Sequence, residues 1–413
     1  MKIIKRTKCQ VCNGELPIPS LDLGNHPMCD DLKKIGSAEA CEEYPIQISL
    51  CRQCLTAHNL YNIKKEFLFP KNYHFRPRFT MDVLKGMQDL VNECELDLGN
   101  LNNKIVCDVG CNDGSLLNFF KIKGCITTGI EPTDAALDAK NSHDIIQDYF
   151  NESSVNLFLE KYGSPDIITF TNVFAHTEEL KETLICLKKI MKSTTYLIVE
   201  NHYLGTIVKT NQFDTFYHEH PRTYSKKSFD EIAKNLNLDI CKIQFPQRYG
   251  GNIRVFLGKK EELKLNIDHK KTQDYIKSIN EDFIEEYFEK IQKFVDNWKG
   301  TTKVAIKKLV SQGFKIYGKS FPGRAAILIK LLDINENIMP AVFEKEKSEK
   351  IDHYVPSTKI KIISDTNWIE NKMMPELMII WGWHIPNEIK NYLRDNSYKG
   401  KIYIPLPEFM ELK

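Results

Sequence analysis

The chain has 413 residues, of which 42% are hydrophobic and 27% charged, and its formal net charge is +2. This composition is typical of a soluble globular protein, and the length suggests two or three domains. A nearly balanced charge without Lys/Arg blocks argues against a nucleic-acid partner. The sequence has no stretch of eighteen apolar residues and no apolar signal region, so we expect a cytoplasmic protein without a membrane span.

Residues 1–70 are rich in cysteine, proline and glycine, which predicts short strands joined by turns. Two C-x-x-C pairs stand here, and each places two thiolates on one turn. Four thiolates form a closed tetrahedral site for a structural zinc ion. The predicted ligands are Cys9, Cys12, Cys51 and Cys54. His26, Cys29 and Cys41 lie between the pairs as alternative ligands without the paired spacing.

From residue 104 to residue 200, short apolar runs alternate with helical patterns, after a helix predicted over 79–98. This alternation predicts a parallel sheet with helices on both faces. The predicted strands are 104–109, 126–130, 144–147, 166–171 and 195–200, and the predicted helices are 115–123, 134–141, 153–162 and 178–191.

Residues 270–312 are helical and charged, and a second α/β series follows them. It comprises strand 314–317, helix 325–332, strands near 341, 360 and 377, and strand 401–405. The fold class is therefore α/β, with domains at 1–70 (metal-binding), 71–300 (central α/β) and 301–413 (second Rossmann-like).

The loop after the first central strand, Val106–Ser115, has the chemistry of a cofactor site. Gly110 lets the backbone approach a ligand closely, and Gly114 relaxes the entry into the next helix, whose N-terminus is rich in donors. The glycines follow G-x-x-x-G instead of the dinucleotide pattern G-x-G-x-x-G. Asp108 before the first glycine would repel a pyrophosphate, but it suits the ammonium of S-adenosylmethionine (SAM).

Residues at the ends of the second and third strands support the prediction of a SAM site. Glu131 closes the second strand, where a carboxylate accepts from both ribose hydroxyls. Asp148 and Tyr149 follow the third strand and could contact the adenine. A dinucleotide fold, or a fold without ligand, is the alternative. The predicted cofactor-binding residues are Asp108, Gly110, Asn112, Asp113, Gly114, Glu131, Asp148, Tyr149 and Asn172.

Two segments carry candidate catalytic groups. Asn172–His176 follows the fourth strand, beside the place of the reactive sulfur in a SAM fold. Tyr217–His220 unites a phenol, two imidazoles and a carboxylate. Histidine is the commonest general base, and Glu219 or another carboxylate could orient it. The alternative is that these histidines are hydrogen-bonded core residues.

Together with the segment Tyr249–Val255, these motifs make the chain similar to the three-domain SAM-dependent nucleotide-sugar C-methyltransferases of deoxysugar pathways. The resemblance covers nearly the whole chain. It implies a zinc-binding N-terminal domain, a central methyltransferase domain and a C-terminal Rossmann-like domain, with the sugar between them. It also implies methylation of a sugar carbon next to a keto group, through an enediolate.

Carried over by motif, the resemblance implies a role for individual side chains. His220 would take the carbon-bound proton, with Tyr217 and Glu219 in support. His176 would contact the sugar or the enolate oxygen, and Tyr73 would reach the active site from the N-terminal domain.

The chain departs from the family pattern at two places, Arg76-Pro77-Arg78 and Pro322–Ala326. The second place lies in the C-terminal loop, which the resemblance expects to face the nucleotide or its phosphates. The two arginines bind an extra anion or form a solvated surface. The candidate substrate-binding residues are Arg76, Arg78, Asn201, Lys319 and Arg324.

Other functions stay open at this point. An O-methyltransferase for a sugar or another small anionic metabolite would use His220 on a hydroxyl. A non-catalytic zinc- and SAM-binding module would keep the folds without turnover. A nucleic-acid methyltransferase lacks the basic face it needs. The sequence names neither the sugar nor the nucleotide, and it leaves the oligomeric state open.

Overall fold

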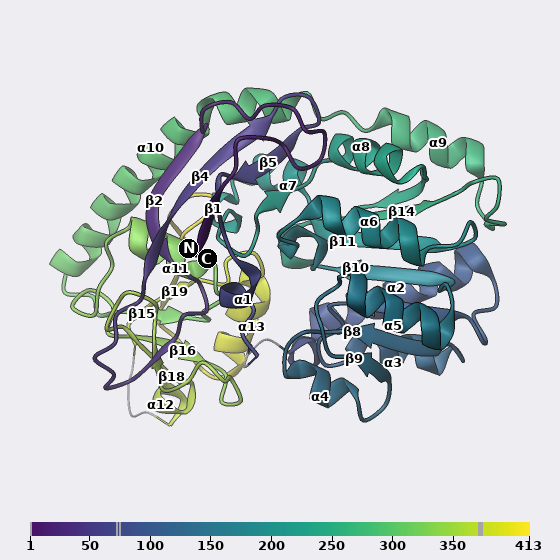
Figure 1. Cartoon of the computed structure of the whole chain (residues 1–413). Helices are drawn as coiled ribbons and strands as arrows, with labels where there is room; N and C mark the ends of the chain where they lie inside the picture. Colours follow the sequence, from purple (N-terminus) through teal and green to yellow (C-terminus); the bar gives the residue numbers. More distant parts are fainter. Residues whose placement is uncertain (1, 72, 74–75, 371–374) are drawn as a thin grey trace.

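The computed structural model of the chain describes residues 2–71, 73, 76–370 and 375–413. Figure 1 shows the central sheet on one side of the molecule and the N- and C-terminal parts together on the other. Across the described residues, no helix combines the length and apolar character that crossing a membrane requires.

The central sheet runs in the order β13-β14-β11-β10-β7-β8-β9, and its five predicted strands are parallel as expected. Strands β14 and β13 add an antiparallel edge that the sequence analysis did not predict. The strands are β7 (Ile105–Val109), β8 (Ile126–Ile130), β9 (Asp144–Ile146), β10 (Ile167–Thr171), β11 (Tyr196–His202), β13 (Asp239–Gln244) and β14 (Asn252–Gly258).

The helices of this part lie on both faces of the sheet, as α2 and α3 pack together and α8 and α9 pack on β13. Helix α8 shows why they form: Ser225 caps its first turn, while Phe229, Ile232 and Leu236 fall at helical spacing and are buried. The helices are α2 (Met81–Leu98), α3 (Ser115–Ile122), α4 (Ala135–Ala139), α5 (Glu152–Tyr162), α6 (Leu180–Ile190), α7 (Leu204–Lys209), α8 (Lys226–Leu236) and α9 (His269–Ser278).

A buried charge network joins helix α2 to the sheet. Glu200 on β11 accepts from Arg248 Nε and Arg254 Nε, both at 2.7 Å. The guanidinium groups in turn donate to the carbonyls of Val83 and Gly86 on α2. Burial raises the pKa of Glu200, but the two cations outweigh it and hold the pKa below its usual value.

The N-terminal part contains the pair β1-β6 and the antiparallel sheet β12-β5-β4-β2. Strand β12 comes from the central part of the chain and pairs with β5, so the two parts share one sheet. The elements are β1 (Ile3–Lys5), β2 (Leu21–Pro27), β3 (Lys33–Lys34), β4 (Glu43–Cys51), β5 (Thr56–Asn59), β6 (Tyr61–Ile63), α1 (Lys65–Leu68) and β12 (Arg222–Thr223).

The C-terminal sheet runs β21-β20-β19-β15-β16-β18-β17-β3, so β3 of the N-terminal part pairs at its edge. Strand β15 was expected at 314–317 and begins two residues later. Helix α10 crosses the expected domain boundary at residue 300. The elements are α10 (Phe283–Ser311), β15 (Ile316–Lys319), α11 (Ala325–Leu331), β16 (Ala341–Glu344), β17 (His353–Tyr354), β18 (Lys361–Ser364), α12 (Thr366–Ile369), β19 (Leu377–Ile380), α13 (Pro386–Asp395), β20 (Lys401–Ile404) and β21 (Met410–Glu411).

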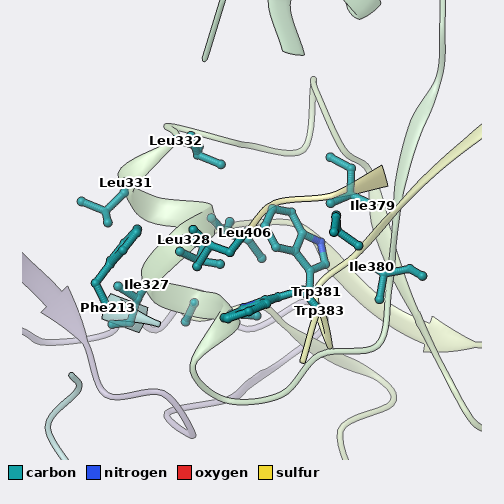
Figure 2. Packing of buried hydrophobic residues seen from close by; sticks show 14 of the residues in the cluster. Phe213, Ile327, Leu328, Leu331, Leu332, Ile379, Ile380, Trp381, Trp383 and Leu406 are labelled. Carbon is teal, nitrogen blue, oxygen red and sulfur yellow. The ribbon is translucent and has the colours of Figure 1, made fainter. Parts of the chain in front are cut away.

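One side chain of the central part is embedded in the C-terminal core. Phe213 is fully buried, and its ring lies 5.0 Å from that of Trp298 on α10. It stands in the short 3-10 turn Phe213–Thr215, which contacts α11. Figure 2 shows it beside Ile327 of α11 in the buried cluster around Trp383.

We therefore predict that Phe213→Ala lowers the free energy of unfolding by about 3–5 kcal/mol, because it leaves a cavity between two parts of the chain. The matched control is Phe67→Ala, since 39% of Phe67 is exposed, and it should cost about 1 kcal/mol or less. Urea unfolding followed by tryptophan fluorescence measures both. Equal costs for the two variants would contradict this packing.

Candidate active site

The four cysteines of the two C-x-x-C pairs converge on one point. The sulfur atoms of Cys9, Cys12, Cys51 and Cys54 all lie within 4.8 Å of one another. A tetrahedral zinc–thiolate site needs sulfurs about 3.8 Å apart, given Zn–S bonds of about 2.3 Å. The donor set therefore fits a structural zinc ion with no open coordination position. The alternatives His26, Cys29 and Cys41 are not part of this cluster.

Neighbouring donors stabilise the thiolates. His58 Nε2 lies 3.2 Å from Cys9 Sγ, and Thr56 Oγ1 lies 3.1 Å from Cys54 Sγ. Since a thiolate only accepts hydrogen bonds, both groups donate to it. Thr56 and His58 belong to β5, which pairs with β12 of the central part. The zinc site thereby lies against β5, and its partner β12 begins two residues after His220.

We predict that Cys51→Ser abolishes zinc binding and lowers the thermal midpoint, because three ligands do not close a structural site. Cys41→Ser is the matched control, since Cys41 lies between the pairs but outside the cluster. Metal content and thermal unfolding of the purified variants measure both effects. Stoichiometric zinc in Cys51→Ser would contradict the ligand assignment.

The glycine loop after β7 has the predicted shape. Gly110 has φ 68°, and a Cβ at this position would lie 2.5 Å from Val173 Cγ2. Asn112 and Asn172 also adopt left-handed φ, at 48° and 55°. The loop residues therefore turn sharply at the carboxyl ends of β7 and β10, where a cofactor approaches the backbone closely in this sheet.

Two buried carboxyl groups face this loop. Asp108 Oδ1 accepts from Thr169 Oγ1 at 2.6 Å, and burial raises the pKa of Asp108 to about 7. Glu131 accepts from the backbone N–H of Asn112 at 3.0 Å and of Thr133 at 2.9 Å. Because both carboxyl groups are buried, a cationic or hydroxyl-bearing ligand would stabilise them.

The remaining predicted cofactor residues have structural partners. Asp113 accepts from Ser115 Oγ at 2.6 Å and from the Arg78 backbone N–H at 3.2 Å. Asp148 accepts from the side chain of Asn151 at 3.1 Å, and Tyr149 OH donates to the Phe69 carbonyl at 3.4 Å. Their contact with a cofactor stays a prediction.

Aromatic and imidazole rings gather at the ends of β10 and β11. The rings of His176 and His220 stack at 5.1 Å, and Tyr217 lies 4.3 Å from His220. His202 lies 5.0 Å from His220 on another side, and Phe69 stacks on His176 at 5.1 Å. The structure thus brings together His176, Tyr217 and His220, which were predicted from separate segments.

His220 has a defined tautomer. Its Nδ1 lies 2.9 Å from the Thr215 carbonyl oxygen, which only accepts, so Nδ1 carries the proton of the neutral ring. Nε2 is then the unprotonated nitrogen. Burial lowers the pKa of His220 to about 4, against the opposing effect of the Thr215 carbonyl, and Arg324 lowers it further. The ring is therefore neutral at physiological pH.

Glu219 is not the hydrogen-bond partner of His220 Nδ1. The sequence analysis expected a carboxylate partner for the imidazole, but Nδ1 donates to a backbone carbonyl. Burial raises the pKa of Glu219 well above its usual value, and Asp30 raises it further, whereas Lys350 opposes the shift. His218, the other imidazole of the run, donates to the Tyr44 carbonyl at 3.1 Å and is a core residue.

The hydroxyl groups of Tyr73 and Tyr217 keep their protons. Burial raises the pKa of Tyr73 and of Tyr217 well above the usual value, and Glu219 adds to both shifts. The ring of Tyr73 lies 5.6 Å from that of Phe69, which stacks on His176. Phe69 thus links Tyr73 to the histidine group, and a contact between Tyr73 and the substrate stays a prediction.

The predicted substrate residues carry partners of their own. Arg76 and Arg78 both pair with Asp138, each at 3.0 Å. Lys319 is buried and pairs with Asp365 at 2.7 Å. Their charges are therefore largely offset within the chain.

The last two predicted substrate residues are buried at the centre of the molecule. Asn201 Oδ1 accepts from the Ala175 backbone N–H at 3.1 Å, while its Nδ2 is buried without a partner among the described residues. Arg324 donates to Thr215 Oγ1 at 3.1 Å, and the carbonyl of the same threonine accepts from His220. Substrate contacts of all five residues stay a prediction.

Sequence reasoning missed several residues of this site. His202 ends β11 as His176 follows β10, so its place at the carboxyl edge of the sheet was a usable signal. Trp383 and Asp214 are linked by a hydrogen bond of 2.8 Å between Trp383 Nε1 and Asp214 Oδ2. They come from distant segments, and no local pattern joins them.

Three family models match consecutive parts of the chain. Residues 9–69 match a zinc binding domain, residues 79–243 a methyltransferase domain, and residues 247–407 a C-methyltransferase C-terminal domain. The C-methyltransferase NovU of Streptomyces niveus is 21% identical over 415 residues, which cover 97% of this chain and 96% of NovU. The chain therefore joins a zinc binding domain, a methyltransferase domain and a C-methyltransferase C-terminal domain in this order.

Two of the solved structures that resemble the chain each match less than half of it. A SAM dependent methyltransferase from Archaeoglobus fulgidus is 14% identical with a TM-score of 0.36, and the match covers 48% of this chain and 100% of that chain. Magnesium protoporphyrin IX methyltransferase from Synechocystis PCC 6803 with bound SAH is 15% identical with a TM-score of 0.36, covering 43% of this chain and 84% of that chain.

The chain is a SAM-dependent methyltransferase with a zinc-binding domain. The residues of its glycine loop fit SAM, because a side chain at Gly110 would overlap Val173 and because two buried carboxyl groups stand beside the loop. Thr171 Oγ1, at the end of β10, is buried without a partner among the described residues. When bound, SAM supplies an electrophilic methyl group.

We predict that Gly110→Ala weakens SAM binding roughly tenfold or more, or about 1.4 kcal/mol, because the new methyl group displaces Val173 and strains the loop. Gly163→Ala is the matched control, since Gly163 has φ 69° but nothing within 4 Å of an added Cβ. Isothermal titration of both variants with SAM measures the effect. Wild-type affinity in Gly110→Ala would place the cofactor elsewhere.

Proposed function

We propose that this methyltransferase methylates a sugar carbon next to a keto group in a nucleotide-linked sugar, and that His220 is the base. The observation that carries the proposal is the buried, neutral ring of His220, whose Nδ1 is hydrogen-bonded to a carbonyl. An imidazole held in this way has only Nε2 with which to accept a proton. A carbon acid next to a ketone is a substrate that requires such a base.

In the proposed reaction, Nε2 of His220 takes the proton of the carbon next to the keto group. The C–H electron pair moves toward the keto oxygen and forms an enolate. The enolate carbon would then take the electrophilic methyl group that bound SAM supplies, and the methyl–sulfur bond electrons would stay on sulfur. The proton held by His220 passes to solvent afterwards.

The neighbours of His220 suit a developing enolate. Tyr217 and Tyr73 are protonated phenols, which can donate a hydrogen bond to an oxygen that becomes negative. Burial lowers the pKa of His176 well below its usual value, so its neutral ring offers one further donor. We propose these three residues as the groups that hold the substrate oxygen.

The meeting of three parts of the chain supports a substrate larger than a simple metabolite. Phe69, which stacks on His176, comes from the end of the N-terminal part, His220 from the central part, and Arg324 from the C-terminal α/β part. A nucleotide-linked sugar can span such a junction, with its sugar beside His220 and its nucleotide along the C-terminal domain. The name of NovU, a C-methyltransferase, favours carbon over oxygen as the methyl acceptor.

We predict that His220→Gln lowers turnover by about a hundredfold or more, because proton removal from carbon loses its base. His218→Gln is the matched control: it removes a buried imidazole from the same run, but glutamine can still donate to the Tyr44 carbonyl. Turnover is measured by mass spectrometry with SAM and a panel of nucleotide-linked keto- and hydroxy-sugars.

The panel also separates the alternatives. A methylated product only from keto-sugars supports carbon methylation. Equal methylation of sugars without a keto group would indicate an O-methyltransferase. SAM binding without any methylated product across the panel would count against a nucleotide-sugar substrate, and undiminished turnover of His220→Gln would refute the base.

A further inference from the structure

We infer that Arg324 of the C-terminal part is a positioning residue that fixes the orientation of His220 through Thr215. The inference rests on the proposed function, because it treats His220 as the base. It changes the expected role of Arg324 from a substrate contact to an internal support.

The direct connection runs through one threonine. Arg324 Nη1 donates to Thr215 Oγ1 at 3.1 Å, and the carbonyl oxygen of the same residue accepts from His220 Nδ1 at 2.9 Å. The side chain of Arg324 is buried, with 9% of its surface exposed. A buried cation with a fixed hydrogen bond therefore holds the residue that selects the tautomer of His220.

A second connection leads from Arg324 to His220 by way of Gln212 and His202. Arg324 Nη1 also donates to Gln212 Oε1 at 3.3 Å, and Gln212 Nε2 donates to the Gly250 carbonyl at 2.7 Å. The neighbouring Tyr249 lies 5.8 Å from the ring of His202, and that ring lies 5.0 Å from His220. One guanidinium group thus holds both Thr215 and Gln212, and each of them leads by a chain of contacts to His220.

Arg324 is itself held in place by the C-terminal part. Its guanidinium carbon lies 5.0 Å from the ring centre of Trp383, whose Nε1 donates to Asp214 Oδ2 at 2.8 Å. The same carboxylate oxygen lies 3.4 Å from Arg324 Nε. A planar guanidinium that stacks on an aromatic ring and donates in two directions cannot be replaced by a lysine ammonium without loss.

The charge of Arg324 acts on the same base. The groups that face His220 are His176, His202, Tyr217 and Arg324. Burial lowers the pKa of both neighbouring imidazoles and raises that of Tyr217, so these three are neutral at physiological pH. Arg324 is the charged member of the group, and its removal raises the pKa of His220.

The experiment reads the state of His220 directly and needs no substrate. Protein labelled with 15N in its histidine rings is saturated with SAH, the demethylated cofactor, and titrated by NMR. His220→Gln identifies the signal. The test variants are Arg324→Met, which keeps length and loses all donors, and Arg324→Lys. Lys330→Met is the control, because it removes another cation of the C-terminal part that pairs with a different part of the chain, at Glu43.

The wild-type protein and Lys330→Met should show a neutral His220 protonated on Nδ1 that titrates below pH 5. Arg324→Met should show mixed tautomers and a titration at least roughly one pH unit higher, because the guanidinium charge is gone and water enters. Arg324→Lys should restore the titration in part but not the single tautomer. If Arg324→Met does not fold, Thr215→Val takes its place, since it removes the side-chain acceptor and keeps the carbonyl.

Wild-type tautomer and titration in Arg324→Met, or in Thr215→Val where that variant takes its place, would overturn the inference. A second readout uses the nucleotide-sugar that the enzyme turns over. A positioning role lowers kcat at least about tenfold with KM unchanged, whereas a raised KM with an unaltered His220 signal would make Arg324 a substrate ligand. Normal turnover of His220→Gln would refute the proposed base instead, whatever the NMR of Arg324→Met shows.

Discussion

The backbone of residues 212–223 is the constraint on which the site depends. Its first part is anchored in the C-terminal core by Phe213, which is fully buried beside Trp298. Its last part is β12, which pairs with β5 of the zinc-binding part. Between these anchors the Thr215 carbonyl accepts from His220 Nδ1. All three parts of the chain therefore set the position of one imidazole.

This arrangement gives the zinc site a structural role instead of a catalytic one. The four thiolates leave no open coordination position, but they stand at the start of β5 and receive hydrogen bonds from its side chains. The backbone N–H of Asn59, at the end of β5, donates to the Pro221 carbonyl at 3.0 Å. The cysteine cluster thus contacts the strand that is hydrogen-bonded to the residue after His220.

Low polarity around the histidines determines their chemistry. Burial lowers the pKa of His176, His202 and His220, so the rings stay neutral where several cations would repel one another. Neutral imidazoles and protonated phenols can accept or donate hydrogen bonds without placing a charge in the buried site. The buried guanidinium of Arg324 adds to the effect of burial and lowers the pKa of His220 further.

The local parts of this description were predictable from sequence. The C-x-x-C pairs, the glycine loop and the five parallel strands are short patterns with a direct physical cause, and the structure confirms the fold and the cysteine cluster. The antiparallel strands β13 and β14 were missed because they follow the motif series without a helix between them. The Thr215 carbonyl and Trp383 could not be found, because backbone partners and contacts between distant segments leave no sequence pattern.

The most direct test of the central claim is solvent exchange without methyl transfer. The enzyme is loaded with SAH and mixed in deuterated water with the nucleotide-linked keto-sugar that it methylates, and deuterium uptake is followed by mass spectrometry. The account predicts one deuterium at the carbon next to the keto group, with uptake lost in His220→Gln. Methylation by the wild type with no exchange at that carbon, or equal exchange in His220→Gln, would contradict it.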